Sequence, residues 1–121
     1  IDILAPAGMS VRAAAAGTIV KLYSSSRGGV TVYQRDTTGR LILYYAHLNG
    51  YAPGLREGMR VKQGQEIAFV GQTGNATVPH LHFEVHRATV AGQWWRGQAV
   101  NPYLALKEGR VEEARMVSAA R

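Results

Sequence analysis

The chain has 121 residues, enough for one domain with a hydrophobic core and too few for two domains of ordinary size. Fourteen basic residues against eight acidic ones give a net charge of +6, which would suit an anionic partner such as nucleic acid, acidic lipid or a cell-wall polymer. The basic residues are scattered singly and are not interleaved with aromatic residues, so we expect no nucleic-acid binding. The absence of cysteine excludes disulfides, thiolate nucleophiles and cysteine-rich zinc sites.

Short strands separated by glycine-rich turns dominate the chain. Residues 18–24, 29–36 and 41–48 are rich in Val, Ile, Tyr and Leu, and hairpin-type turns separate them, which predicts an antiparallel meander. Residues 54–71 then place brief apolar pieces between glycines, as in a small and tightly turned sandwich or barrel.

We therefore predict one mainly β domain over residues 1–106. Its expected architecture is an antiparallel β-sandwich of short, glycine-punctuated strands, of the barrel-sandwich or duplicated-hybrid kind. The tail, 107–121, has helical composition with a weak apolar stripe, so we expect an appended helix or a frayed helical end. No apolar run approaches the roughly 20 residues that span a bilayer. Because the chain begins at Ile1 without a methionine, we expect an excised domain or a processed product. This leaves room upstream for a leader, a membrane anchor or a regulatory domain.

Residues 80–86, His-Leu-His-Phe-Glu-Val-His, alternate strictly between polar and apolar. On a strand this pattern puts the three histidines and the glutamate on one face and the apolar residues on the other. Imidazole and carboxylate groups bind divalent metals and transfer protons near neutral pH. Alternate residues lie about 6.5 to 7 Å apart, which suits one direct metal ligand and one outer group. We expect the functional site on this strand.

Four polar residues, two of them in 80–86, each have a structural and a functional interpretation. Asp2 alone would be a solvated carboxylate at a strand end, but its pairing with His82 favours a site. His47, on an apolar strand, would alone be a hydrogen-bonded core residue, and the histidines of 80–86 again favour a site. Glu84 is either an outer partner that orients an imidazole or a solvated carboxylate. We interpret His86 as a polar residue at the strand end, outside the site.

Two further features bear on the shape of a cleft. Tyr44 and Tyr45 are adjacent and face opposite ways, so at most one lines a cleft beside His47, and alternation selects Tyr45. We expect a core role for both. Residues 73–79 are small and turn-prone, which suits a loop that forms one wall of a cleft, the alternative being a simple connector.

Five motifs follow one another along the chain: Asp2-Ile-Leu-Ala-Pro-Ala-Gly, Tyr45-Ala-His-Leu, Val61-Lys-Gln-Gly-Gln-Glu-Ile, Pro79-His-Leu-His-Phe-Glu and Asn101-Pro-Tyr-Leu. Together they resemble the lysostaphin/LytM-type zinc metallopeptidases, which cut peptide cross-links of bacterial peptidoglycan. The resemblance covers about residues 1–104. Its Ala-His-Leu and His-x-His elements in combination are highly specific.

The resemblance implies a metal site and a mechanism. The family's zinc is held by a His-x-x-x-Asp motif and by the second His of His-x-His, which implies Asp2 and His82 as ligands. The first His of that motif would lie ahead of Ile1, so we expect the domain to be truncated at its N-terminus. His47 and His80 match the family's catalytic histidines, one helping to deprotonate the attacking water and the other steadying the oxyanion or the water. Which residue has which role stays open.

The implied function is zinc-dependent hydrolysis of cross-links or stem peptides of peptidoglycan, in the cell envelope, either periplasmic or extracellular. The first alternative is a degenerate domain that binds and activates other cell-wall hydrolases, against which the presence of all four site residues argues. The second is a carrier or phosphotransfer domain, because residues 58–71 resemble the hairpins of lipoyl and biotinyl domains. Lys62, however, does not lie at a hairpin tip, as a modified lysine must. The sequence leaves the oligomeric state open.

Overall fold

The computed structural model describes residues 1–88, 97–100 and 116–118. All of its regular elements are strands, and every pairing between them is antiparallel. The mainly β prediction is therefore confirmed. In chain order the strands are β1 (Asp2–Leu4), β2 (Ser10–Arg12), β3 (Gly17–Ser25), β4 (Gly29–Asp36), β5 (Leu41–Tyr51), β6 (Arg60–Val61), β7 (Glu66–Val70), β8 (His80–Ala88), β9 (Gly97–Val100) and β10 (Val117–Ser118).

Strands β3, β4 and β5 form the predicted meander, and local chemistry closes its turns. In the turn between β4 and β5, the Asp36 carboxylate accepts hydrogen bonds from the Thr38 hydroxyl and from the Leu41 backbone N–H. Gly39 adopts a φ of 74° there, a left-handed conformation that glycine reaches without steric cost. The side chain of an aspartate that bonds to nearby backbone is a common way to end a strand and start a turn.

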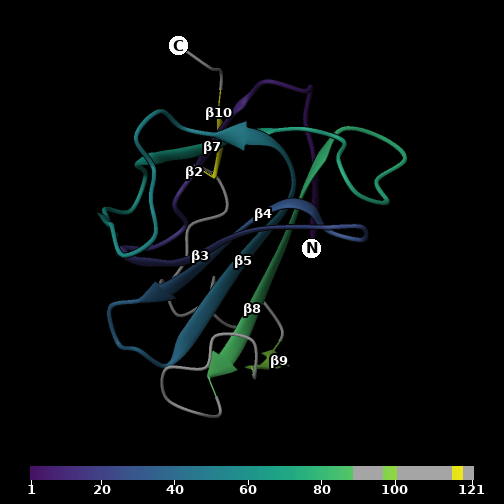
Figure 1. Cartoon of the computed structure of the whole chain (residues 1–121). Helices are drawn as coiled ribbons and strands as arrows, with labels where there is room; N and C mark the ends of the chain where they lie inside the picture. The colour runs from purple at the N-terminus through teal and green to yellow at the C-terminus, as the bar shows by residue number, and fades with distance from the viewer. Residues whose placement is uncertain (89–96, 101–115, 119–121) are drawn as a thin grey trace.

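Strand β5 is the centre of the sheet and changes partner along its length. Its first part, up to Ala46, pairs with β8, and its last part, from Leu48, pairs with β7, while β4 lies along its other edge. Figure 1 shows β4, β5 and β8 running side by side, with β9 at the far edge of β8. His47 lies at the change of partner.

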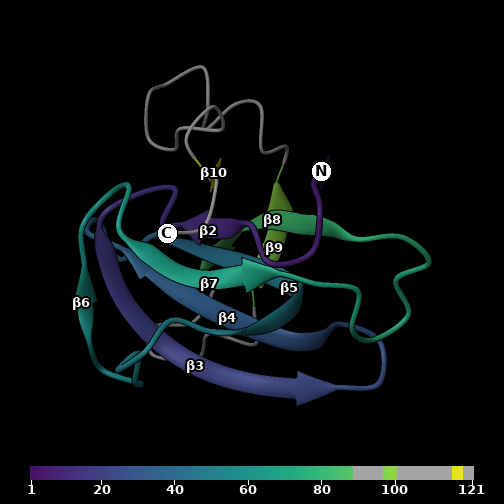
Figure 2. The same cartoon turned by 90° about the horizontal axis from the view of Figure 1, so that it is seen from above.

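The sheet curls over itself and encloses the core. In Figure 2, β2 and β7 lie above β4 and β3, so the two ends of one curved sheet form the two layers of the sandwich. Fully buried side chains fill the space between them, among them Tyr45 and Phe83, whose ring centroids lie 5.3 Å apart. Burial of aromatic side chains of this size supplies much of the stability of a small domain.

The tail differs from the expected helix where the structure describes it. Val117 and Ser118 form strand β10, which pairs with β2, and Met116 before them is fully buried. The physical reason is that β2 has an open edge whose backbone groups need partners, so the Met116 carbonyl accepts a hydrogen bond from Arg12 N–H at 2.6 Å. The rest of 107–121 lies outside the described residues. Within the described ranges, no helix is long and apolar enough to cross a membrane.

Candidate active site

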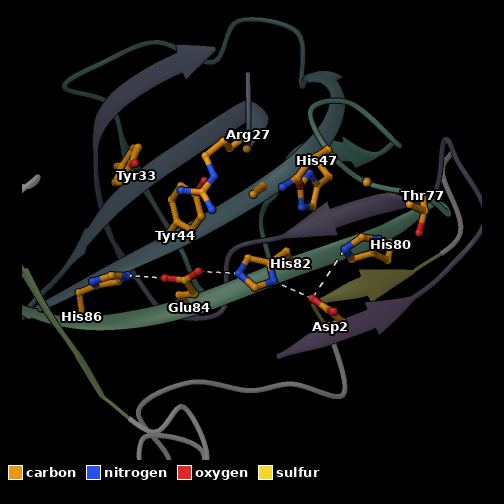
Figure 3. Close-up of a pocket in the computed structure, with 14 residues that line it drawn as sticks. Asp2, Arg27, Tyr33, Tyr44, His47, Thr77, His80, His82, Glu84 and His86 are labelled. Carbon is orange, nitrogen blue, oxygen red and sulfur yellow. Dashed lines mark hydrogen bonds and ion pairs between the residues drawn. The ribbon is translucent and has the colours of Figure 1, made fainter. Parts of the chain in front are cut away.

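Strand β8 presents its polar face to an open groove of about 720 Å³. Leu81, Phe83 and Val85 are fully buried on the other face, as the alternation predicted. A groove of this volume is in the usual range for a ligand site. The residues of β8 that line it are His80, His82, Glu84 and His86 (Figure 3).

Strand β1 brings a carboxylate to this face. It pairs with β8 so that Asp2 lies directly opposite His82. Opposite residues of an antiparallel pair project to the same side of the sheet. As a result, Asp2 Oδ1 lies 2.6 Å from His82 Nδ1 and 3.6 Å from His80 Nε2. The structure thus joins residues that are 80 positions apart in the sequence.

Asp2, His80 and His82 fit a metal ion. One ligand atom of each lies within 4.8 Å of those of the other two, closer than the strand spacing alone suggested. Carboxylate oxygen and imidazole nitrogen are the atoms that catalytic zinc sites use. His82 Nε2 lies 2.5 Å from Glu84 Oε2, and a carboxylate on the far nitrogen is what holds a metal-binding imidazole in orientation. Of the two interpretations of Glu84, the contact supports the outer partner.

His47 reaches the groove through a break in the alternation of β5. Its backbone has a φ of 61°, the left-handed region that a non-glycine residue seldom adopts. The register of β5 against β4 also shifts here, because Val30 pairs with Leu48 whereas Val32 pairs with Tyr45. This bulge turns the His47 side chain to the same side as Ala46. Strained backbone of this kind persists where the surrounding structure holds it and is frequent at functional sites.

Two backbone carbonyls fix the tautomers of His47 and His80. His47 Nδ1 lies 2.8 Å from the Thr73 carbonyl oxygen, and His80 Nδ1 lies 2.8 Å from the Val78 carbonyl oxygen. A carbonyl only accepts, so each Nδ1 carries the proton and donates. In the neutral rings both Nε2 atoms therefore keep a free lone pair. The ring centroids are 4.8 Å apart, so two proton acceptors stand side by side in the groove.

Ionic hydrogen bonds link the remaining groups of the site into one chain, Asp2, His82, Glu84 and His86 (Figure 3). The hydrogen bond between Asp2 and His82 lowers the pKa of the Asp2 carboxyl. The hydrogen bond from His82, which has the larger effect, and the bond from His86 hold the pKa of Glu84 well below its usual range. The bond to Glu84, and after it the bond to Asp2, raises the pKa of His82 although burial opposes the rise. Without a metal, His82 is thus favoured as an imidazolium between two carboxylates.

The core role expected of both tyrosines is confirmed for Tyr45 and wrong for Tyr44. Tyr44, not Tyr45, lines the groove, and burial raises its pKa to about 12. Tyr45 is fully buried in the core, where its hydroxyl donates to Gln34 Oε1 at 2.7 Å. Strict alternation selected Tyr45 because it assumed a regular strand as far as His47. The bulge at His47 places that residue on the face of Tyr44 instead.

The structure brings together all four residues predicted for the site, Asp2, His47, His80 and His82. The loop 73–79 forms one wall, as expected, through Asn75, Ala76 and Thr77. Six lining residues were missed or set aside: Arg27, Gly28, Tyr33, Tyr44, Ala46 and His86. The alternation of 80–86 already placed His86 on the correct face, whereas no sequence signal indicates that the turn after β3 reaches the groove.

Histidine and carboxylate groups beside two further imidazoles in an open groove are typical of metal-dependent hydrolases. The comparisons with known proteins give the family. The chain belongs to peptidase family M23, which it matches over residues 1–102. This agrees with the resemblance to lysostaphin/LytM-type peptidases drawn from the motifs.

Individual relatives support the assignment. The chain is 40% identical over 104 residues to the DD-carboxypeptidase/endopeptidase Mpg of Neisseria meningitidis, covering 84% of this chain and 21% of the relative. It superposes on the catalytic domain of lysostaphin from Staphylococcus simulans with a TM-score of 0.77 and 32% identity, covering 88% of this chain and 76% of that one. A zinc-containing peptidase from Vibrio cholerae gives a TM-score of 0.69 at 29% identity, covering 82% of this chain and 27% of that one. The chain thus spans about a fifth of the length of Mpg.

Proposed function

We propose that this domain hydrolyses peptide bonds in the cross-links or stem peptides of bacterial peptidoglycan, with zinc held by Asp2 and His82. The observation that carries the proposal is the convergence of these two groups, 2.6 Å apart, beside the Nε2 atoms of His47 and His80, which carry lone pairs in the neutral rings. The family's His-x-x-x-Asp motif would supply a third ligand from the position four residues before Asp2, ahead of Ile1. Bound zinc would supply Lewis-acid chemistry, which lets water act as a nucleophile near neutral pH.

Two histidines of this chain, His47 and His80, would carry out the proton transfer. His47 Nε2 and His80 Nε2 are lone-pair acceptors, so either can take a proton from the attacking water. The protonated imidazole can then donate its proton to the departing amine. The other histidine can hydrogen-bond the developing oxyanion when it is an imidazolium, because its Nε2 then also carries a proton. Because Thr73 and Val78 fix both rings through Nδ1, the reactive nitrogens need little reorganisation.

Glu84 and His86 support His82 from the side away from Asp2. With His82 Nδ1 available to hold the metal, its Nε2 would carry the proton and donate to Glu84 Oε2. His86 Nε2, 2.7 Å from Glu84 Oε1, fixes the other carboxylate oxygen. We therefore assign Glu84 as a positioning residue that sets the ring orientation of His82.

Family membership and charge support the substrate. The chain belongs to a peptidase family whose relatives include Mpg, named for carboxypeptidase and endopeptidase activity, and lysostaphin. The groove is open and large enough for an extended peptide segment. A net charge of +6 suits work on an anionic envelope. We place the protein in the cell envelope, periplasmic or extracellular.

The test is zinc content together with hydrolysis of purified peptidoglycan, on a chain extended upstream to include the His-x-x-x-Asp histidine. We expect near-stoichiometric zinc and release of peptides, and a His80→Ala variant that keeps its zinc and loses hydrolysis. A metal-free and inactive extended chain would contradict the proposal. It would favour a degenerate domain that binds and activates other cell-wall hydrolases.

A further inference from the structure

The groove contains one lysine or arginine among its described lining residues, Arg27. The two lining carboxylates, Asp2 and Glu84, are both engaged by histidines. Within the described part of the chain, the Arg27 guanidinium has no ion pair or hydrogen bond. Arg27 is exposed, and its side chain points into the groove on the side opposite Asp2 (Figure 3). The groove therefore holds a permanent positive charge that no described residue compensates.

The backbone at Arg27 is fixed to both walls of the groove. Its carbonyl accepts a hydrogen bond from Asn75 N–H at 2.9 Å, which ties it to the loop 73–79. The next carbonyl, of Gly28, accepts from His47 N–H at 2.8 Å, which ties it to β5. Gly28 also packs so closely on Tyr44 that an added Cβ would lie 2.3 Å from the tyrosine hydroxyl. The Arg27 side chain thus starts from a position set by the same residues that build the site.

The ligand that fits this charge is a carboxylate. A guanidinium presents parallel N–H donors that match the two oxygens of a carboxylate, and such charged pairs are stronger than neutral hydrogen bonds. Peptides of bacterial peptidoglycan carry free carboxylates at chain ends and on side chains. We propose that Arg27 binds a carboxylate of the peptide substrate and so selects carboxylate-bearing peptides over their amidated counterparts. The inference rests on the proposed function and names the substrate feature that its groove recognises.

Two probes that differ in one kind of group test this assignment: a cross-linked stem peptide with free carboxylates and the same peptide with carboxamides in their place. Binding of both is measured by calorimetry in the His80→Ala background, which does not depend on turnover. We expect the carboxylate probe to bind on the order of 10-fold more tightly, since hydrogen bonds to charged groups contribute more than neutral ones. Arg27→Gln should abolish this preference by weakening the carboxylate probe alone, and Arg27→Lys should retain part of it.

Arg40→Gln is the matched control, because Arg40 is an exposed arginine in another hairpin turn and does not line the groove. It should keep the full preference. Equal binding of the two probes before mutation, or an Arg27→Gln variant that weakens both probes equally, would overturn the role of Arg27. If the protein without the His80→Ala substitution hydrolysed neither probe, that result would count against the proposed function. The binding measurement would still decide the role of Arg27.

Discussion

Removal of the Glu84 carboxylate should weaken metal binding without unfolding the domain. Glu84 Oε2 lies 2.5 Å from His82 Nε2 and Oε1 lies 2.7 Å from His86 Nε2, so one side chain holds two imidazoles. Glu84→Gln keeps an oxygen that can accept from His82 but loses the charge, whereas Glu84→Ala loses the contact altogether. Loss of such an outer partner costs about 10- to 100-fold in metal affinity. We expect Glu84→Gln near the lower end of this range and Glu84→Ala near the upper end.

The assay is competition for zinc against a chelator of known affinity, with thermal unfolding as a check on folding. Glu57→Gln is the control, because Glu57 makes an exposed ion pair with Lys21 and lies outside the groove. It should bind zinc like the parent protein. If Glu84→Ala bound zinc as tightly as the control while remaining folded, the assignment of Glu84 as a positioning residue would be refuted.

The other predictions concern His47, the pH dependence and the core. His47→Asn should abolish hydrolysis while changing the free energy of unfolding little, because asparagine tolerates a φ of 61°; a large loss of stability in denaturant titration would contradict this. In the metal-free protein, the lowered pKa of Glu84 stabilises the fold above its ordinary value of 4.5, and this contribution is lost as the pH falls through the folded value. The raised pKa of His82 stabilises the fold below its ordinary value of 6.5, and this contribution is lost as the pH rises through the folded value. Denaturation measured within and on either side of this window should therefore show the highest stability between these two values. Zinc should remove the loss at higher pH because it binds neutral His82, and equal stability within the window and on both sides of it would refute the linkage. Phe83→Ala should lower the free energy of unfolding by about 3–5 kcal/mol, since the ring is fully buried against Tyr45, and a loss below about 1 kcal/mol would show that the core repacks.

Much of the site follows from the sequence because strand geometry repeats every two residues. The alternation of 80–86 fixed which residues of β8 face the groove and which enter the core. The hairpin strands were predictable for the same reason, with turn residues marking their ends. The partnership of Asp2 with His82, across 80 positions of sequence, was indicated by the family motifs and not by any local rule.

The remaining features depend on irregular backbone and on packing between distant segments. The bulge at His47 has no reliable sequence signal, since histidine seldom adopts a positive φ, and it reversed the choice between Tyr44 and Tyr45. Arg27 reaches the groove only because its turn is bonded to Asn75 and to β5. The short pairing of β10 depends on the open edge of β2, which composition alone does not reveal.

The most direct test of the central claim is anomalous diffraction at the zinc edge from crystals of the upstream-extended chain. We predict a single strong peak in the groove, within about 2.0–2.2 Å of Asp2 Oδ1 and His82 Nδ1. Glu84 should remain bonded to His82 Nε2, and His47 and His80 should face the ion without replacing Asp2. A peak elsewhere in the protein, or no peak in crystals grown with zinc, would contradict the claim that this groove is a metal-dependent active site.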